Sequence, residues 1–312
     1  MSEFYLRRNA LSHPLRVDAT REQFEDIRCA VNIQVEALYI EQKYDFVMEN
    51  YLEFEESILR CGLSDMLLGG RDRKDYNADT ALFNRRIMNL LTAYKTYDDT
   101  YRQHFNRIFL KDRDILRQAK QSFSEEYDSR VGYWMIPKIR NYVQHQGFPM
   151  HGSSYASRWI EDEHGVERSR HTVDLYISPE ELSGGKFNLE TRERLWGMRE
   201  KVDLKFLIRD FMEGFSAAHT RNREILVNRL EWANDYISSV IADFLVATGY
   251  KSSHFLTLVG PEGRVSVAHL ANEQRLYLIK KNTKLIRLTD HYISNEVESK
   301  EIEFPRKPDV RR

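Results

Sequence analysis

Apolar residues recur at helical intervals over much of the N-terminal half of the chain. Residues 1–19 are irregular, and the first long pattern begins at Thr20, which forms the T-x-x-Q signature of a capping box with Gln23. Its apolar positions continue at spacings of three and four residues to about residue 61. Gly62 follows, and glycine commonly ends helices, so we expect the first helix to end there.

Three more helices are expected in the same half. The same spacing predicts helices at about 78–110 and 112–127, and another in the stretch VGYWMIPKIRNYVQHQGFP at 131–149. The loop between the first two helices contains Gly69, Gly70 and a cluster of charges. The pattern favours a four-helix, up-and-down arrangement.

The pattern changes after the fourth helix, where alternating polar and apolar positions first indicate strands. The first expected element is a β-hairpin, with strands at 155–161 and 168–177 around a turn at 162–165. Helices are expected at 189–198, 203–248 and 271–286, and short strands at 254–259 and 264–269. The chain should end in a tail at 301–312. We predict a mostly α protein, with a helical bundle over 1–150 and an α+β portion over 151–312. The helix at 203–248 is long enough to lie along the bundle, so a single interleaved domain is the open alternative.

Composition indicates a soluble globular protein. Of the 312 residues, 41% are hydrophobic and 30% are charged, and no apolar run is long enough to cross a membrane. The first residues lack the apolar centre of a signal peptide, so we expect a cytoplasmic protein with no membrane partner. Cys29 and Cys61 fall in or at the end of helical patterns and are interpreted as packing residues.

The overall charge does not indicate a nucleic-acid binder, because 47 basic residues stand against 48 acidic ones. Between Lys111 and Arg140, seven basic residues stand against five acidic ones. Such a small excess is more typical of a solvated helix face than of a groove for nucleic acid.

The fourth predicted helix gathers a guanidinium, an amide and an imidazole. Its apolar side carries Met135, Ile136, Ile139, Tyr142 and Val143, and its polar side carries Arg140, Asn141, Gln144 and His145. Pro137 lacks an amide proton, so the helix should either start near it or kink there. Gly147 is expected to adopt a left-handed conformation and end the helix before Pro149.

The segment Arg140–His145, RNYVQH, resembles the R-x(4 to 6)-H motif of HEPN ribonucleases, in the form with a polar residue directly after the arginine. The likeness covers residues 20–150 as architecture, whereas the motif itself is only six residues long. The resemblance implies RNA cleavage without a metal, giving 2′,3′-cyclic phosphate and 5′-hydroxyl ends. It also implies a composite site built from two copies of the motif.

The same loose pattern occurs at three other places, which are Arg8–His13, Arg158–His164 and Arg264–His269. Pro14 disfavours a helix around the first, and the other two lie in predicted strands or a hairpin. Helical context therefore favours Arg140–His145.

The chemistry that fits this segment is attack of a ribose 2′-hydroxyl on the adjacent phosphate. His145 could accept the proton of the 2′-hydroxyl or protonate the leaving 5′-oxygen, because histidine exchanges protons near neutral pH. Arg140 could stabilise the charge that develops on the phosphate, and Asn141 would orient the phosphate or the imidazole. Three more residues are expected to contact substrate, namely Gln144, Tyr142 and Lys138. Taken singly, each polar residue is more typical of an ordinary helix surface than of an active site.

Geometry adds a condition to this hypothesis. Arg140 and His145 are five residues apart, which separates them by about 140° around a helix. One helix therefore does not direct both side chains at one phosphate. We predict a homodimer that brings two such helices together across a two-fold axis.

The predicted function is a HEPN-type endoribonuclease acting as a toxin or defence effector, with RNA as substrate and a regulatory or antitoxin protein as a further partner. HEPN members regulated at a tyrosine carry it two residues after the histidine, where this chain has Gly147, which argues against an antitoxin that modifies that position. The alternative is a non-catalytic HEPN-like module for dimerisation or nucleotide binding. No phosphate-binding loop, nucleophile elbow or zinc-spaced Cys or His pair is found, so no cofactor and no metal are expected.

Overall fold

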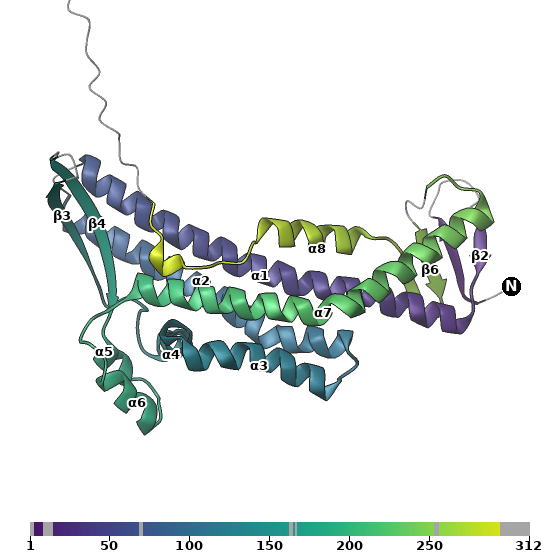
Figure 1. Ribbon diagram of the computed structural model, residues 1–312, viewed down its shortest axis with the longest axis horizontal. Helices are drawn as coiled ribbons and strands as arrows, with labels where there is room; N and C mark the ends of the chain where they lie inside the picture. Colours follow the sequence, from purple (N-terminus) through teal and green to yellow (C-terminus); the bar gives the residue numbers. More distant parts are fainter. Residues whose placement is uncertain are drawn as a thin grey trace, which may run out of the picture.

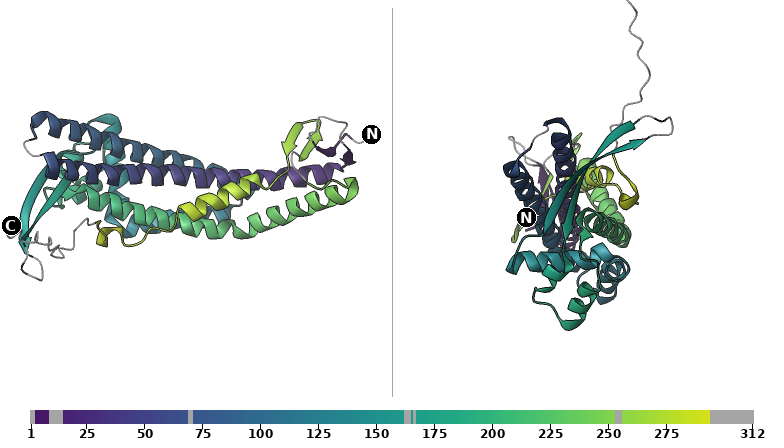
Figure 2. Two further views of the ribbon diagram at one scale, coloured as in Figure 1. Left: turned by 90° about the horizontal axis from the view of Figure 1, so that it is seen from above. Right: turned by 90° about the vertical axis from the view of Figure 1, so that its left-hand side faces the viewer.

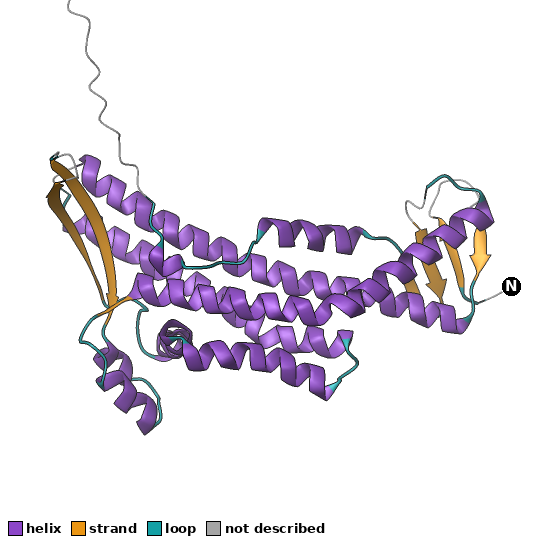
Figure 3. Cartoon of the chain, in the orientation of Figure 1, coloured by secondary structure: helices purple, strands orange, loops and turns teal. Residues whose placement is uncertain are grey.

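Three long helices run along the long axis of the protein (Figure 1). They are α1 (Arg21–Leu68), α2 (Arg73–Ile108) and α7 (Leu204–Thr248), with the shorter α3 (Arg113–Ser129) alongside. The computed structural model describes residues 3–8, 15–68, 71–161, 165, 167–252 and 256–293. Over these ranges the chain is mostly helical, as predicted (Figure 3).

Three predicted features lie outside the described residues. They are the loop at Gly69 and Gly70, most of the turn at 162–165 and the tail at 301–312.

Within the described ranges, every helix is either too short or too polar to cross a membrane.

The capping box predicted at the start of α1 is confirmed, but the predicted end of this helix is wrong. The amide of Gln23 donates to Thr20 Oγ1 over 3.1 Å, and the amide of Thr20 donates to Gln23 Oε1 over 2.9 Å. Gly62 lies inside α1, which continues to Leu68. A glycine costs a helix only about 1 kcal/mol, and packing of α1 against α2 and the hairpin outweighs that cost.

The fourth helix, α4 (Val131–His145), does not complete an up-and-down bundle. Figure 1 shows α4 nearly end-on, crossing the direction of α3 and α7. The backbone of Arg130, between α3 and α4, is extended and redirects the chain. α7 lies beside α1 and α3 instead, so the expected arrangement is wrong in its fourth member.

Two small antiparallel sheets lie at opposite ends of the long helices (Figure 2). One contains four strands in the order β2-β1-β6-β7, namely β1 (Tyr5–Arg8), β2 (Arg16–Asp18), β6 (Leu256–Gly260) and β7 (Gly263–Ser266). The sequence predicts β6 and β7, but β1 and β2 lie in the segment for which it predicts no element. These two strands are short, and pairing of β1 with β6 from the other end of the chain stabilises them.

The predicted hairpin is confirmed as β3 (Gly152–Glu161) and β4 (Glu167–Ile177), with β5 (Val202–Asp203) added at the edge of β4. Val173, Leu175 and Ile177 are buried on one face of β4, as their alternation predicts. The hairpin begins a few residues after α4. The remaining elements are the helices α5 (Pro179–Ser183), α6 (Leu189–Trp196) and α8 (Leu270–Lys281) and the 3-10 turn η1 (Leu288–Asp290).

One hydrophobic core contains residues from both sides of residue 150. It includes the fully buried rings of Phe54 and Phe83 from the N-terminal half and of Phe211 and Phe215 from α7. The apolar face of α7 therefore fills the space between the N-terminal helices.

A buried ionic cluster lies within this core, where α7 meets α1. Arg223 donates two hydrogen bonds to the carboxylate of Glu41, over 2.9 and 2.7 Å. His219 lies between Glu41, at 3.2 Å from Nε2, and the hydroxyl of Tyr97, at 2.9 Å from Nδ1. Burial alone would raise the pKa of Glu41, but His219 and Arg223 outweigh burial and lower that pKa to about 2.

Replacing Arg223 with alanine should lower the free energy of unfolding by about 3–5 kcal/mol, because the carboxylate of Glu41 would stay buried without its cation. Urea denaturation followed by circular dichroism measures this change. The matched control is Arg117→Ala, since Arg117 pairs with Asp114 over 3.1 Å on the exposed surface and should contribute little. Equal unfolding midpoints for the two variants would contradict the prediction.

The same cluster should make the wild type sensitive to acid. Because the folded-state pKa of Glu41 is depressed, its stabilising contribution is fully present above the unfolded value of 4.5 and is lost as the pH falls towards about 2.

Candidate functional site

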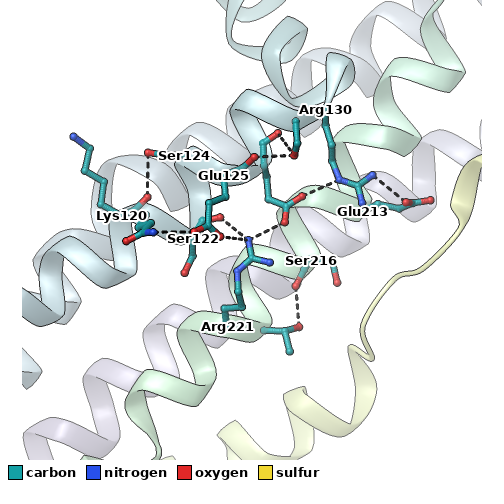
Figure 4. Close-up of polar contacts among 12 residues, drawn as sticks. Lys120, Ser122, Ser124, Glu125, Arg130, Glu213, Ser216 and Arg221 are labelled. Atoms are coloured by element: carbon teal, nitrogen blue, oxygen red, sulfur yellow. Dashed lines mark hydrogen bonds and ion pairs between the residues drawn. The ribbon is translucent and has the colours of Figure 1, made fainter.

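Charged contacts to α7 hold the start of α4. Arg130 donates from Nε to Glu126 over 2.8 Å and from Nη1 to Asp210 over 2.9 Å and Glu213 over 3.1 Å. Figure 4 shows Arg130, which lies between α3 and α4, reaching towards α7, with Arg221 of α7 reaching back to α3. Arg221 donates to the other oxygen of Glu126 over 2.8 Å, so two arginines share one carboxylate and join the helices.

Glycine allows α4 to cross α7 with the two backbones in contact. The amide of Gly132 donates to Asp210 over 2.7 Å. A Cβ at Gly132 would lie 2.2 Å from the carbonyl oxygen of Leu207, and one at Gly214 would lie 2.7 Å from Cδ of Arg130. Gly132 has no room for a side chain because the obstacle is backbone, whereas a side chain at Gly214 would have to displace Arg130.

α4 starts before Pro137 and ends without a left-handed glycine. It begins at Val131, so Pro137 lies inside it and offers no amide to the carbonyl of Tyr133. At its end the amides of Gln146 and Gly147 both point to the carbonyl of Tyr142, at 2.8 and 3.4 Å. Gly147 does not adopt positive φ, so the expectation for this residue is wrong.

Gly147 has a different role from the one expected. A Cβ there would lie 2.8 Å from the hydroxyl of Tyr142, so glycine leaves room for this ring at the helix end. The side-chain amide of Gln146 donates to the carbonyl of Gly184 over 3.0 Å and ties the helix end to the segment after α5.

The predicted division of α4 into an apolar and a polar side agrees with the burial of its residues. Met135, Ile136 and Ile139 are buried, and Tyr142 and Val143 are half-buried against the core. The polar residues are more accessible, with Arg140 and Asn141 half-buried and Gln144 and His145 exposed. Among the described residues, these four side chains have no hydrogen-bond or ion-pair partner, so all four are available to a ligand.

Lys138 is expected to contact substrate, but its side chain is not open to solvent. Its side chain is buried, its ammonium donates to the hydroxyl of Tyr127, and the nitrogen lies 4.4 Å from the ring centre of Tyr127 and 4.3 Å from that of Trp134. The guanidinium of Arg194 also lies over Trp134, at 4.2 Å. Burial first, and then the charge of Arg194, lower the pKa of Lys138 to about 8.

The helix divides the predicted site residues between two sides. Lys138, Asn141 and His145 are spaced by three and four residues and lie within about 60° of one another around the axis. Arg140 lies about 140° from His145, so the structure does not bring these two together within one chain. The described chain is a single copy and leaves the predicted dimer as a prediction.

Two residues near α4 have no signal in the sequence. Arg194 lies on α6, far along the chain from Trp134, and no spacing rule links them. His151 lies 5.5 Å from the ring of Tyr142, and its Nδ1 accepts the amide of Ser178 over 3.0 Å. Its Nε2 is buried without a partner in the described part of the chain. Burial lowers the pKa of His151, which favours the neutral imidazole.

In the described ranges, no group of three or more His, Cys, Asp or Glu side chains could hold a metal ion.

Comparison with known proteins finds no matching family model, no similar curated protein and no similar solved structure.

Gly132→Ala should displace α4 from α7 and lower the melting temperature, because the new methyl group would overlap the carbonyl of Leu207. We expect a loss of about 1–3 kcal/mol, the usual cost of forcing an extra carbon into a packed site. The matched control is Gly62→Ala inside α1, where the added Cβ meets Val173 at 3.5 Å and helix propensity improves. Thermal denaturation of both variants is the measurement, and equal melting temperatures would contradict the close crossing.

Proposed function

We propose that this chain is a metal-independent endoribonuclease of the HEPN type, with Arg140, Asn141 and His145 in its active site. The observation that carries the proposal is the segment RNYVQH at the accessible end of a helix that is firmly held at its start. In the three alternative matches to the pattern, the arginine lies on a strand: Arg8 in β1, Arg158 in β3 and Arg264 in β7.

The proposed reaction needs two proton transfers and neutralisation of phosphate charge. His145 accepts the proton of the 2′-hydroxyl while the 2′-oxygen bonds to phosphorus. The bond from phosphorus to the 5′-oxygen breaks, and the departing oxygen receives a proton from water. The guanidinium of Arg140 donates to the phosphate oxygens as their charge grows. The products are a 2′,3′-cyclic phosphate and a 5′-hydroxyl.

The positions of Arg140 and His145 support a two-copy site. A dimer about a two-fold axis near the end of α4 would place Arg140 of one copy beside His145 of the other. Lys138 and Arg194 add positive charge on the His145 side of the helix, where an RNA backbone would approach.

Arg140→Ala and His145→Ala should each reduce RNA cleavage by about 100-fold or more, because each removes a charge-stabilising or proton-transfer group. The assay uses single-stranded and structured RNA with a chelator present, and the product ends are mapped. The matched controls are Arg85→Ala on the exposed face of α2 and His291→Ala near η1, which should leave the rate unchanged. Cleavage that survives both site substitutions, with melting temperatures intact, would refute the proposal.

Mixing the two inactive variants tests the two-copy site. If Arg140 of one chain serves His145 of another, a mixture of Arg140→Ala and His145→Ala chains should recover part of the activity, since some mixed dimers hold one intact pair. Sedimentation at the assay concentration checks that dimers form. A wild type that is monomeric and still cleaves RNA would overturn the two-copy site. Dimers that never cleave RNA would instead favour the non-catalytic module.

A further inference from the structure

A pocket of about 290 Å³ lies between α2 and α3 and contains none of the predicted site residues. Its floor includes the buried rings of Tyr101 and Phe105. Four cations also line the pocket, namely Arg102, Arg113, Arg117 and Lys120, and no carboxylate is among the lining residues. The volume is at the lower end of the range for ligand pockets.

The cations of this pocket are weakly neutralised by the protein. Arg117 pairs with Asp114 over 3.1 Å, but both side chains are largely exposed, and such pairs are weak. Arg102 donates to the neutral hydroxyl of Tyr101 over 3.1 Å. Arg113 and Lys120 have no acidic partner in the described ranges, and Figure 4 shows Lys120 pointing away from the carboxylates that bind Arg221.

A second pocket shows the opposite arrangement. It measures about 360 Å³ between α3 and α7, and its lining includes Glu125, Glu224 and Arg221. Arg221 is already bound to Glu126 over 2.8 Å. Here the protein neutralises its own arginine, so of these two pockets only the α2–α3 pocket has cations without carboxylates in its lining.

The turn that joins α2 to α3 has a strained backbone. Leu110 and Lys111 are consecutive residues with φ of 51° and 67°, a left-handed conformation that costs a non-glycine residue about 1–2 kcal/mol. Strain of this kind persists where the surroundings impose it, and it is frequent beside ligand sites. This turn sets the spacing of the two helices at the end of α3 remote from α4 (Figure 1).

We propose that the α2–α3 pocket binds an organic phosphate of about mononucleotide size, with its phosphates on the four cations and its base over the apolar floor. Arginine suits this role because its planar donors match phosphate oxygens. The phosphate could come from a soluble nucleotide or from the 5′ end of an RNA strand. The pocket is separate from α4, so phosphate binding and RNA cleavage can fail independently.

Calorimetric titration of the full-length protein tests the pocket with three probes: ADP, pyrophosphate and a 5′-phosphorylated, 2′-O-methylated oligoribonucleotide that resists cleavage. Arg113→Gln combined with Lys120→Gln should weaken binding about tenfold or more, because two charge-assisted contacts are lost. Leu116→Trp should also weaken binding by filling the pocket while keeping every charge. The matched control is Lys74→Gln combined with Arg85→Gln, on exposed positions of α2 outside the pocket.

The pattern of binding identifies the source of the phosphate. Tighter binding of ADP than of pyrophosphate, lost in the pocket variants, supports a soluble nucleotide, whereas binding of the oligoribonucleotide alone supports an RNA end. Binding of no probe, or equal binding by the pocket variants and the control, would overturn the proposal. Binding that survives in the pocket variants but is lost in Arg140→Ala would place the ligand at α4 and overturn it as well. RNA cleavage by the pocket variants, measured in parallel, reports separately on the proposed active site.

Discussion

The carboxylate of Asp210 determines where the candidate site lies. It accepts a hydrogen bond from the guanidinium of Arg130 and another from the amide of Gly132, at the point where α4 begins to cross α7. Because Gly132 has no side chain, the backbones of α4 and α7 touch there, and this contact constrains the direction of α4. That direction turns the apolar side of α4 towards the core. Arg140, Asn141 and His145 are consequently left at the surface.

Charges in this protein fall into two groups with different surroundings. Two cations on α7 meet carboxylates of α1 with good geometry, as Arg223 meets Glu41 and Arg209 meets Glu55 through two hydrogen bonds each. In these pairs, the attraction between the charges offsets the desolvation cost of burying them, and the pairs hold α7 against α1. Arg140 and the pair of Lys138 and Arg194 lack such carboxylates in the described ranges. Lys138 and Arg194 instead lie over the ring of Trp134 in cation–π contacts.

Sequence periodicity was sufficient to place the long helices and the β3–β4 hairpin. The helices bury residues at helical spacing, and Val173, Leu175 and Ile177 alternate along β4. Periodicity also placed Met135 and Ile139 correctly on the buried side of α4. It failed where tertiary contacts decide: packing carries α1 past Gly62, and Tyr142 determines what Gly147 does. The sequence did not predict the burial of Lys138, because this burial depends on Tyr127 of α3, which no spacing rule links to α4.

The residues of the proposed site lie on two different sides of α4. His145 and Asn141 share a side with Lys138, where positive charge is already concentrated by Arg194. Arg140 lies about 140° away from His145 around the helix axis. In the proposed site, one chain would supply proton transfer on one side of α4 and charge stabilisation on the other. A two-fold dimer pairs the same surface patch of both copies, so Arg140 of one copy would face His145 of the other.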